Sequence, residues 1–188
     1  MTLDHLWAGW RATYVESFGD AHGQPASTSS SPLSPRLAAL TSGLGKEECV
    51  FCAILQADAL SDEERLVVWR GGPVVAVLNA YPYASGHLLV MPVRHVCDLE
   101  ALSVEESAAL WEGISRAVVA VKAAYGPEGL NLGLNLGRAA GAGIPGHLHV
   151  HIVPRWVGDT NFMTTTASVR VLPEPLADTY ARLRAAWS

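Results

Sequence analysis

The segment GHLHVHIVPR, residues 146–155, alternates three histidines with three aliphatic residues. A period of two is typical of a β-strand, in which successive side chains point to opposite faces. The aliphatic residues are therefore expected to enter a core, while the other face carries His147, His149 and His151, spaced about 6.5–7 Å apart. An edge strand with exposed histidines would show the same pattern. Clustered imidazoles more often bind metals or take part in catalysis, so the segment predicts a functional site.

The composition of the chain predicts one globular domain with a large core. Of 188 residues, 49% are hydrophobic and only 16% are charged, which is unlike a disordered chain. The net charge of -5 supplies no basic field, so nucleic acid is not an expected partner. A small phosphorylated ligand is compatible with this charge, because a few local donors are enough to hold it.

The sequence shows no apolar run long enough to span a membrane, and no signal-type segment at its start. We therefore expect no membrane partner and a cytoplasmic location. Cys49 and Cys52 form a C-x-x-C pair, whereas Cys97 stands apart, which does not fit a secreted disulfide framework. The pair is expected to bind a metal or to serve redox chemistry, and Cys97 is expected to be a core residue.

The chain is divided here into three parts: an aromatic N-terminal arm over 1–18, a flexible Ser- and Pro-rich linker over 19–36, and a domain over 37–188. The patterns predict helices and strands in this order: a short helix over 35–40, strands over 66–70, 74–78 and 87–92, a helix over 103–125, strands over 130–136 and 146–155, and a closing helix over 175–187.

The helix over 103–125 has the clearest signals. A capping box at Ser103 and Glu106 predicts its start, and Gly126-Pro127 predicts its end. Its apolar face is expected to include Trp111 and Ile114, which continue at helical spacing.

Several further motifs stand in a fixed order before the histidine segment: Asn79, Gly86-His87 and Asn135-Leu-Gly137. Together with the three alternating histidines they resemble the histidine triad family, over roughly residues 49–156. Residues 6–14 (LWAGWRATY) and 154–162 (PRWVGDTNF) are similar to the bacterial branch that splits diadenosine tetraphosphate. The resemblance implies an α+β fold with an antiparallel sheet of about five strands and a packed helix. It also implies a homodimer, which the aromatic arm would help to build.

The resemblance implies catalysis through a nucleotidyl-histidine. His149 would attack the α-phosphorus, while His151 and the main chain at His147 would orient its imidazole and bind phosphoryl oxygens. His87 would act indirectly, through a hydrogen bond that fixes which ring nitrogen can attack. His87 also fits a satisfied core histidine. The acceptor is left open: inorganic phosphate makes the protein a phosphorylase, water a hydrolase, and a phosphoramidate substrate a phosphoramidase. A nucleotide-binding module without turnover is an alternative from another class.

Nucleotide contacts are expected at Asn79, near the ribose, and at donors for the phosphates: Asn135, the N–H groups of Gly141, Ala142 and Gly143, and the two triad histidines His149 and His151. Many relatives have a Gln or Ser just before the histidine strand, where this chain has GAGIPG over 141–146. An expected side-chain donor is therefore missing, and either the backbone replaces it or the leaving group is held differently.

A second group of residues is expected to bind a structural zinc ion: Cys49, Cys52, His95 and His147. Two thiolates and two imidazoles form a closed tetrahedral site with no position left for water. This resembles the zinc-bearing members of the family and makes His147 a ligand and not a base. A redox C-x-x-C, plain buried cysteines, or a metal held by the triad itself are the alternatives.

Overall fold

The structure is a computed structural model that describes residues 33–45, 48–159 and 174–187. The chain forms two units, one of residues 1–30 and 157–171, and a main unit of residues 31–156 and 172–188. The main unit contains all the described helices and strands. The predicted arm and most of the predicted linker lie outside the described residues.

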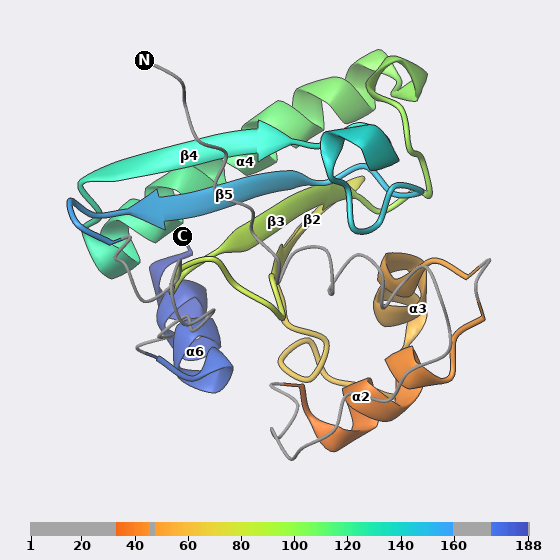
Figure 1. Cartoon of the computed structure of the whole chain (residues 1–188), viewed down its shortest axis with the longest axis horizontal. Coiled ribbons are helices and arrows are strands. Elements are labelled where there is room, and N and C mark those ends of the chain that lie inside the picture. The colour runs from red at the N-terminus through yellow and green to blue at the C-terminus, as the bar shows by residue number, and fades with distance from the viewer. Residues whose placement is uncertain (1–32, 46–47, 160–173, 188) are drawn as a thin grey trace, which may run out of the picture. The chain divides into compact units, whose positions relative to one another are not determined.

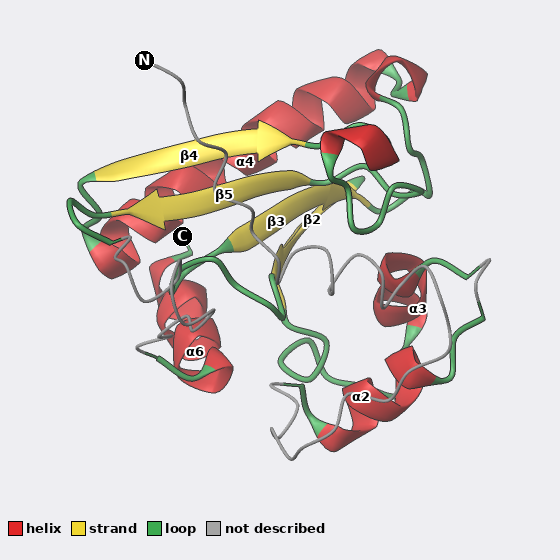
Figure 2. Ribbon diagram, viewed as in Figure 1, coloured by secondary structure: helices red, strands yellow, loops and turns green. Residues whose placement is uncertain are grey.

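The main unit is built on one antiparallel sheet of five strands in the order β1-β2-β3-β5-β4 (Figure 1, Figure 2). The strands are β1 (Val67–Gly71), β2 (Val74–Leu78), β3 (Leu88–Pro92), β4 (Gly129–Leu134) and β5 (Val150–Arg155). The predicted α+β class with a five-stranded antiparallel sheet is confirmed.

The described helices are α2 (Pro35–Ser42), α3 (Val50–Gln56), α4 (Val104–Tyr125) and α6 (Leu176–Ala186), with short 3₁₀ turns η1 (Leu99–Ala101) and η2 (Arg138–Ala140). The α4 helix starts with the predicted capping box and ends at Gly126 in the left-handed conformation. The sequence did not predict α3, which is only seven residues long. None of the described helices has the length and apolar character needed to cross a bilayer.

Each face of the sheet has its own core. One core lies under α4 and α6 and includes Val74, Leu88, Val150 and Ile152 from the strands. The second core joins α3 to the opposite face and contains Phe51, Leu55, Val67, Val75, Val77, Leu89 and Met91. Because β2 and β3 are covered on both faces, every residue of these two strands is buried.

The face of α4 that packs on the sheet is only partly the predicted one. Ile114 is buried, but Trp111 is 70% exposed, so the prediction for Trp111 is wrong. Small residues line the contact instead: a Cβ at Gly113 would lie 3.1 Å from Val74. The same Cβ would lie 3.2 Å from the indole of Trp69, so the side chains of Val74 and Trp69 already fill this contact and Trp111 lies outside it.

The histidine segment is only partly a strand. The ladder of β5 starts at Val150, because the amide of Leu148 donates to the carbonyl of Val96 (2.6 Å) and not to a neighbouring strand. The predicted alternation still holds, since Leu148, Val150 and Ile152 all enter the core under α4. His147 and His149 thus share the face of His151 but lie before the ladder begins.

Candidate functional site

Three histidines meet on the α3 face of the sheet. The ring centroid of His151 lies 5.1 Å from that of His149 and 5.2 Å from that of His87. His87 and His149 are 1% and 7% exposed, so both are held in a largely dry environment. The structure therefore brings together the three residues that were expected to be catalytic.

The hydrogen bond of His149 determines which of its nitrogens can react. Its Nδ1 lies 2.7 Å from the carbonyl oxygen of His147, which can only accept, so Nδ1 carries the proton. The lone pair is then on Nε2. Burial lowers the pKa of His149, which keeps the ring neutral near pH 7. A neutral imidazole with an available Nε2 lone pair is the nucleophilic form of histidine.

A second chain of hydrogen bonds determines the proton positions of His87 and His151. The amide of Tyr83 donates to Nδ1 of His87 (3.0 Å), so the proton of His87 is on Nε2. That Nε2–H donates to Nδ1 of His151 (3.0 Å). His151 consequently carries its own proton on Nε2, where it can donate to an oxygen of a ligand.

Asn79 stabilises the loop that precedes His87 in the chain. Its Oδ1 accepts the amide of Tyr81 (3.0 Å), and its Nδ2 lies 3.3 Å from Nδ1 of His87. The structure thus places Asn79 against a histidine of the site. A contact with a ribose, expected from the sequence, stays a prediction.

Gly86 lets the chain turn into β3 and deliver His87. Its φ is +82°, and a Cβ here would lie 2.8 Å from the ring of Tyr125 and 3.3 Å from Pro154. Both the backbone conformation and the close approach require a glycine. Tyr125 comes from the end of α4, so the helix on one face of the sheet shapes the turn that carries a histidine of the other face.

Asn135 and the glycine-rich loop follow β4. Leu134, the last residue of β4, pairs with Val150, the first residue of β5, so Asn135 leaves the ladder at the end where His149 enters it. In the loop, the amide of Gly141 donates to Arg138 (2.9 Å) and that of Ala142 to Gly137 (3.4 Å). These two amides are used within the loop, and the predicted binding of phosphate by this backbone therefore depends mainly on Gly143.

The two cysteines and two further histidines form a compact cluster. The potential ligand atoms of Cys49, Cys52, His95 and His147 all lie within 4.8 Å of one another. Cys49 Sγ lies 3.4 Å and Cys52 Sγ 3.6 Å from His147 Nδ1, while Cys52 Sγ lies 3.3 Å from His95 Nδ1. The four residues predicted to bind zinc are therefore brought together.

The cluster has the dimensions of a tetrahedral zinc site. With Zn–S of about 2.3 Å and Zn–N of about 2.0–2.1 Å, sulfur and nitrogen ligands lie about 3.6 Å apart, close to the separations found here. His147 Nε2 donates to the carbonyl of Pro92 (2.9 Å), which leaves Nδ1 as the ligand nitrogen. Both the donor types and the tautomer of His147 suit zinc.

Without a bound cation, Cys52 of the cluster favours its protonated form. Burial, followed by the neighbouring Cys49, raises the pKa of Cys52 to about 11. A metal cation reverses this preference, since the thiolate is the form that binds metal. Cys97 is exposed and donates to Asp98 (3.1 Å), so the prediction that it is a core residue is wrong.

The segment that carries His95 is clamped to α4. Arg94 donates to both carboxylate oxygens of Glu106 (2.7 and 2.8 Å) and to the carbonyl of Ala101 (2.9 Å). The bond from Arg94, followed by that from Ser103, lowers the pKa of Glu106 to about 2. One carboxylate thus caps α4 and holds the chain next to His95 of the cluster.

Two aromatic residues of the site were missed by the sequence reasoning. Tyr83 stacks on His151, with centroids 5.8 Å apart and an angle of 15° between the rings. Phe51 contacts both His147 and His149. Its place between the two cysteines was the available signal. The contact itself depends on α3 packing against the sheet, which no local pattern shows.

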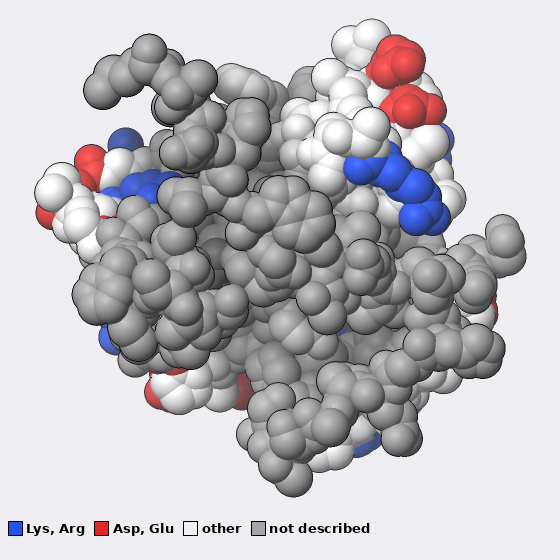
Figure 3. Space-filling model, viewed as in Figure 1, with Lys and Arg blue, Asp and Glu red and all other residues white. Residues whose placement is uncertain are grey.

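Charge on the visible face is mixed. In Figure 3, the parts of this face that the structure describes show small groups of basic and acidic atoms near one another and no continuous basic surface. This agrees with the net charge of -5.

Comparisons with known proteins agree with this geometry. The family model of the HIT domain matches residues 61–157. The chain is 42% identical over 186 residues to a Mycobacterium tuberculosis protein named AP-4-A phosphorylase, covering 99% of this chain and 85% of that protein.

Solved structures show the same fold. A Zn-bound histidine triad family protein from Mycobacterium smegmatis has a TM-score of 0.60 and 30% identity, over 76% of this chain and 95% of that one. A hypothetical histidine triad nucleotide-binding protein from Sulfolobus tokodaii has a TM-score of 0.60 and 28% identity, over 73% and 91%. The resemblance seen in the sequence is confirmed, and the chain belongs to the HIT domain family.

Proposed function

We propose that the protein is a nucleotidyl-transfer enzyme that splits a dinucleoside polyphosphate such as diadenosine tetraphosphate through a nucleotidyl-His149 intermediate. The observation that carries this proposal is the hydrogen bond from His149 Nδ1 to the carbonyl of His147, which leaves a buried, neutral Nε2 as nucleophile. The 42% identity to a protein named AP-4-A phosphorylase, over 99% of this chain, supports the choice of substrate.

The first step forms a bond between His149 Nε2 and the α-phosphorus and breaks the bond to the bridging oxygen of the leaving nucleotide. With diadenosine tetraphosphate, ATP leaves and AMP stays on the histidine. The Nε2–H of His151 and the amide of Asn135 are suited to stabilise the charge on the phosphoryl oxygens. The hydrogen bond from His87 keeps His151 in the donor tautomer that this role requires.

The second step returns the nucleotidyl group to an acceptor. Inorganic phosphate attacks the phosphorus, the P–N bond breaks, and ADP forms while His149 recovers its lone pair. Water in place of phosphate would give AMP and make the protein a hydrolase. We propose phosphate as the acceptor, supported by the name of the relative from Mycobacterium tuberculosis.

Intact-mass measurement after incubation with diadenosine tetraphosphate without phosphate tests the first step. A gain of one adenylyl group is expected in the wild type, and none in His149→Ala. Adding phosphate should discharge the adduct and yield ADP. Nucleotide binding without any adduct or product would favour the non-catalytic module. An adduct that discharges only to AMP would favour the hydrolase.

The cysteine and histidine cluster is proposed to hold a structural zinc ion, with Cys49, Cys52, His95 and His147 as ligands. The ion would stabilise the local fold and take no part in the chemistry, since all four positions are filled by protein. The described cysteines are unpaired, which suits a reducing compartment, and we propose a cytoplasmic location.

We also propose that the protein forms a homodimer. Trp111 and Val119 on α4 are 70% and 61% exposed, and Leu132 on β4 is 48% exposed. The β4 strand is an edge of the sheet, which offers open backbone hydrogen-bonding groups to a second copy. Sedimentation should show a dimer in the wild type and dissociation in Trp111→Glu, while Val104→Glu, at the exposed start of α4, should remain dimeric. A monomeric wild type would refute the proposal.

A further inference from the structure

We infer that Phe51 is a positioning residue that couples the metal cluster to the orientation of His149, so that metal affinity and nucleotidyl transfer depend on one side chain. The inference rests on the proposed function for its kinetic consequence. Its structural consequence can be measured without turnover.

Phe51 touches both parts of the site. Its ring centroid lies 5.5 Å from that of His147, at an angle of 82°, and 5.2 Å from that of His149, at 62°. Both are T-shaped contacts, in which a ring edge meets a ring face. One side chain thus packs against a proposed metal ligand and the proposed nucleophile at once.

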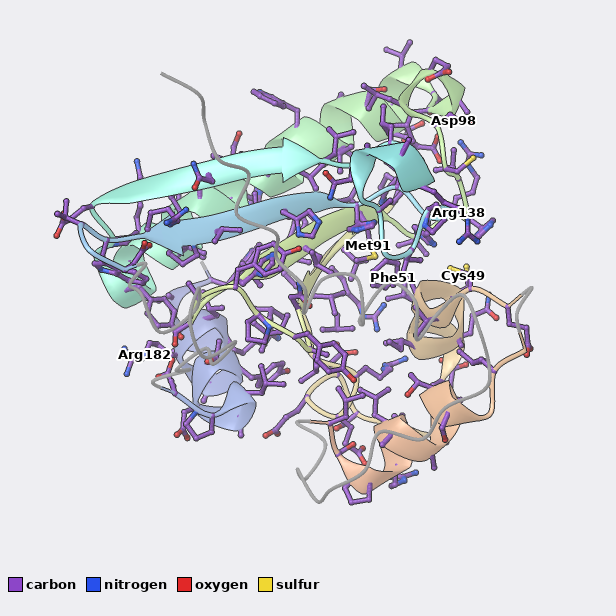
Figure 4. The ribbon with its side chains drawn as sticks, viewed as in Figure 1. Cys49, Phe51, Met91, Asp98, Arg138 and Arg182 are labelled. Atoms are coloured by element: carbon purple, nitrogen blue, oxygen red, sulfur yellow. The ribbon has the colours of Figure 1, made fainter. Side chains whose placement is uncertain are left out.

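The position of Phe51 in the chain links it directly to two of the proposed metal ligands. It lies between Cys49 and Cys52, whose sulfur atoms both approach His147 Nδ1. In Figure 4, Cys49 marks the start of α3, and Phe51 is directed from this helix toward Met91 of β3. A metal bound by both cysteines would hold the backbone on each side of Phe51.

The α3 helix depends on tertiary contacts for its position. It has seven residues, and its N-cap, Cys49, makes no side-chain capping bond. A helix this short is not stable by itself. Its position therefore depends on Phe51 and Leu55 in the second core, on α2, on the hydrogen bond from Arg65 to the carbonyl of Leu55 (3.3 Å), and on the cysteines where they bind a metal.

The direction of His149 Nε2 depends on the contacts around its ring. The carbonyl of His147 accepts the hydrogen bond of Nδ1, and the rings of Phe51 and His151 contact the imidazole, with centroids 5.2 and 5.1 Å away. In the proposed coupling, the contact with Phe51 restricts rotation of the ring about this hydrogen bond. A shorter or non-aromatic side chain would leave the hydrogen bond intact and the direction of Nε2 less defined, which lowers the rate of attack more than the binding of substrate.

The test compares Phe51→Leu with Leu55→Val in the metal-loaded protein. Leu55 lies on the same helix and in the same core, and has no ring contact with a histidine. Three quantities are measured: kcat and KM, zinc affinity by competition with a chromophoric chelator, and the ring signals of His149 by long-range ¹H–¹⁵N NMR, assigned with His149→Gln.

We expect Phe51→Leu to lower kcat about 10-fold with KM within twofold, to lower zinc affinity about 10-fold, and to shift the His149 ring signals. Leu55→Val should leave all three near the wild type. If Phe51→Leu fails to fold by circular dichroism, Phe51→Met carries the same expectations with a side chain closer in volume.

Three results would overturn the inference. Unchanged zinc affinity in the Phe51 variants would remove the coupling, unchanged His149 signals would remove the positioning, and a rise in KM at constant kcat would make Phe51 a substrate contact only. If the wild type itself shows no turnover, the proposed function fails, whereas zinc affinity and the His149 signals still decide the coupling.

Discussion

The two ends of the histidine segment are held by different forces. His151 lies within the ladder of β5, opposite Leu89 of β3 and Gly133 of β4, so backbone hydrogen bonds on both sides fix it. His147 and His149 lie before the ladder. They are held by the amide of Leu148, by the carbonyl of Pro92, and by the side chains of α3 and the cysteine cluster.

The two ends of the segment therefore differ in what keeps them ordered. The end at His151 inherits its order from the central strands of the sheet, which unfold only with the domain. The end at His149 depends on a short helix and on the proposed metal, so its order can be lost while the sheet remains. The proposed nucleophile, His149, is on the end that can lose its order, and His151, proposed to bind phosphate, is on the end that cannot.

The largest expected effect is at the metal end. Cys52→Ser should abolish stoichiometric zinc binding and lower stability by about 4 kcal/mol or more, since structural zinc contributes directly to folding. The melting temperature should fall by about 10 °C or more. Metal analysis and calorimetry provide the measurement. Cys97→Ser, at an exposed cysteine outside the cluster, is the matched control, and an equal loss in both variants would contradict the proposed site.

At the ladder end, His87→Leu removes the donor that fixes the tautomer of His151. We expect nucleotidyl transfer to slow roughly 100-fold, comparable to the loss of one stabilising donor, with zinc content unchanged. His87→Gln, which keeps an N–H donor, should recover part of the rate. Full activity in His87→Leu would show that His151 needs no such support, and a loss of zinc would show that the two ends are not independent.

A smaller effect is expected at the turn that delivers His87. Gly86→Ala should cost about 1–3 kcal/mol, because an alanine must adopt a positive φ and also meets the ring of Tyr125. Gly72→Ala is the control: its φ is +65°, but no atom lies within 4 Å of an added Cβ. Chemical denaturation of both variants measures the difference, which isolates the contact with Tyr125. Equal losses would mean that this contact does not hold the turn.

The smallest effect is expected at the exposed clamp beside His95. The pKa of Glu106 is about 2 in the folded protein, below the value of about 4.5 expected in the unfolded chain. Its carboxylate therefore stabilises the fold fully above about pH 4.5, and this contribution is lost as the pH falls toward about 2. Glu106→Gln should therefore lower the melting temperature by about 1–3 °C at pH 7 and by less at pH 3.

The neighbouring Glu105→Gln serves as the control for this measurement. It lies in the same first turn of α4, so it shares the helix dipole but not the bonds with Arg94. A difference between wild type and Glu106→Gln that does not change with pH would show that Glu106 stabilises the clamp by packing alone.

Local patterns were sufficient for much of the fold. The capping box of α4, the alternation of Leu148, Val150 and Ile152, and the strands on either side of Gly72 are all properties of neighbouring residues, and each is seen in the structure. The sequence also placed the proposed zinc ligands and the three site histidines in two groups, the first from residue types and spacing and the second from the resemblance to the histidine triad family. The structure brings both groups together.

The exposed position of Trp111, the short α3 helix, and the end of the ladder at Val150 were not predictable in the same way. Each depends on competition between partners that are distant in sequence. The side chains of Val74 and Trp69 fill the contact at Gly113, so Trp111 lies outside it. The carbonyl of Val96 accepts the amide of Leu148 in place of a neighbouring strand.

The sequence by itself determined which residues could react and which could bind a metal, since these are properties of side-chain chemistry and spacing. Only the tertiary structure decided which nitrogen of each site histidine carries the proton. The carbonyl of His147 puts the lone pair of His149 on Nε2, and the amide of Tyr83 sets the protons of His87 and His151. The physical reason is that an imidazole has two nitrogens, and the partner that a folded chain supplies to one of them determines what the other can do.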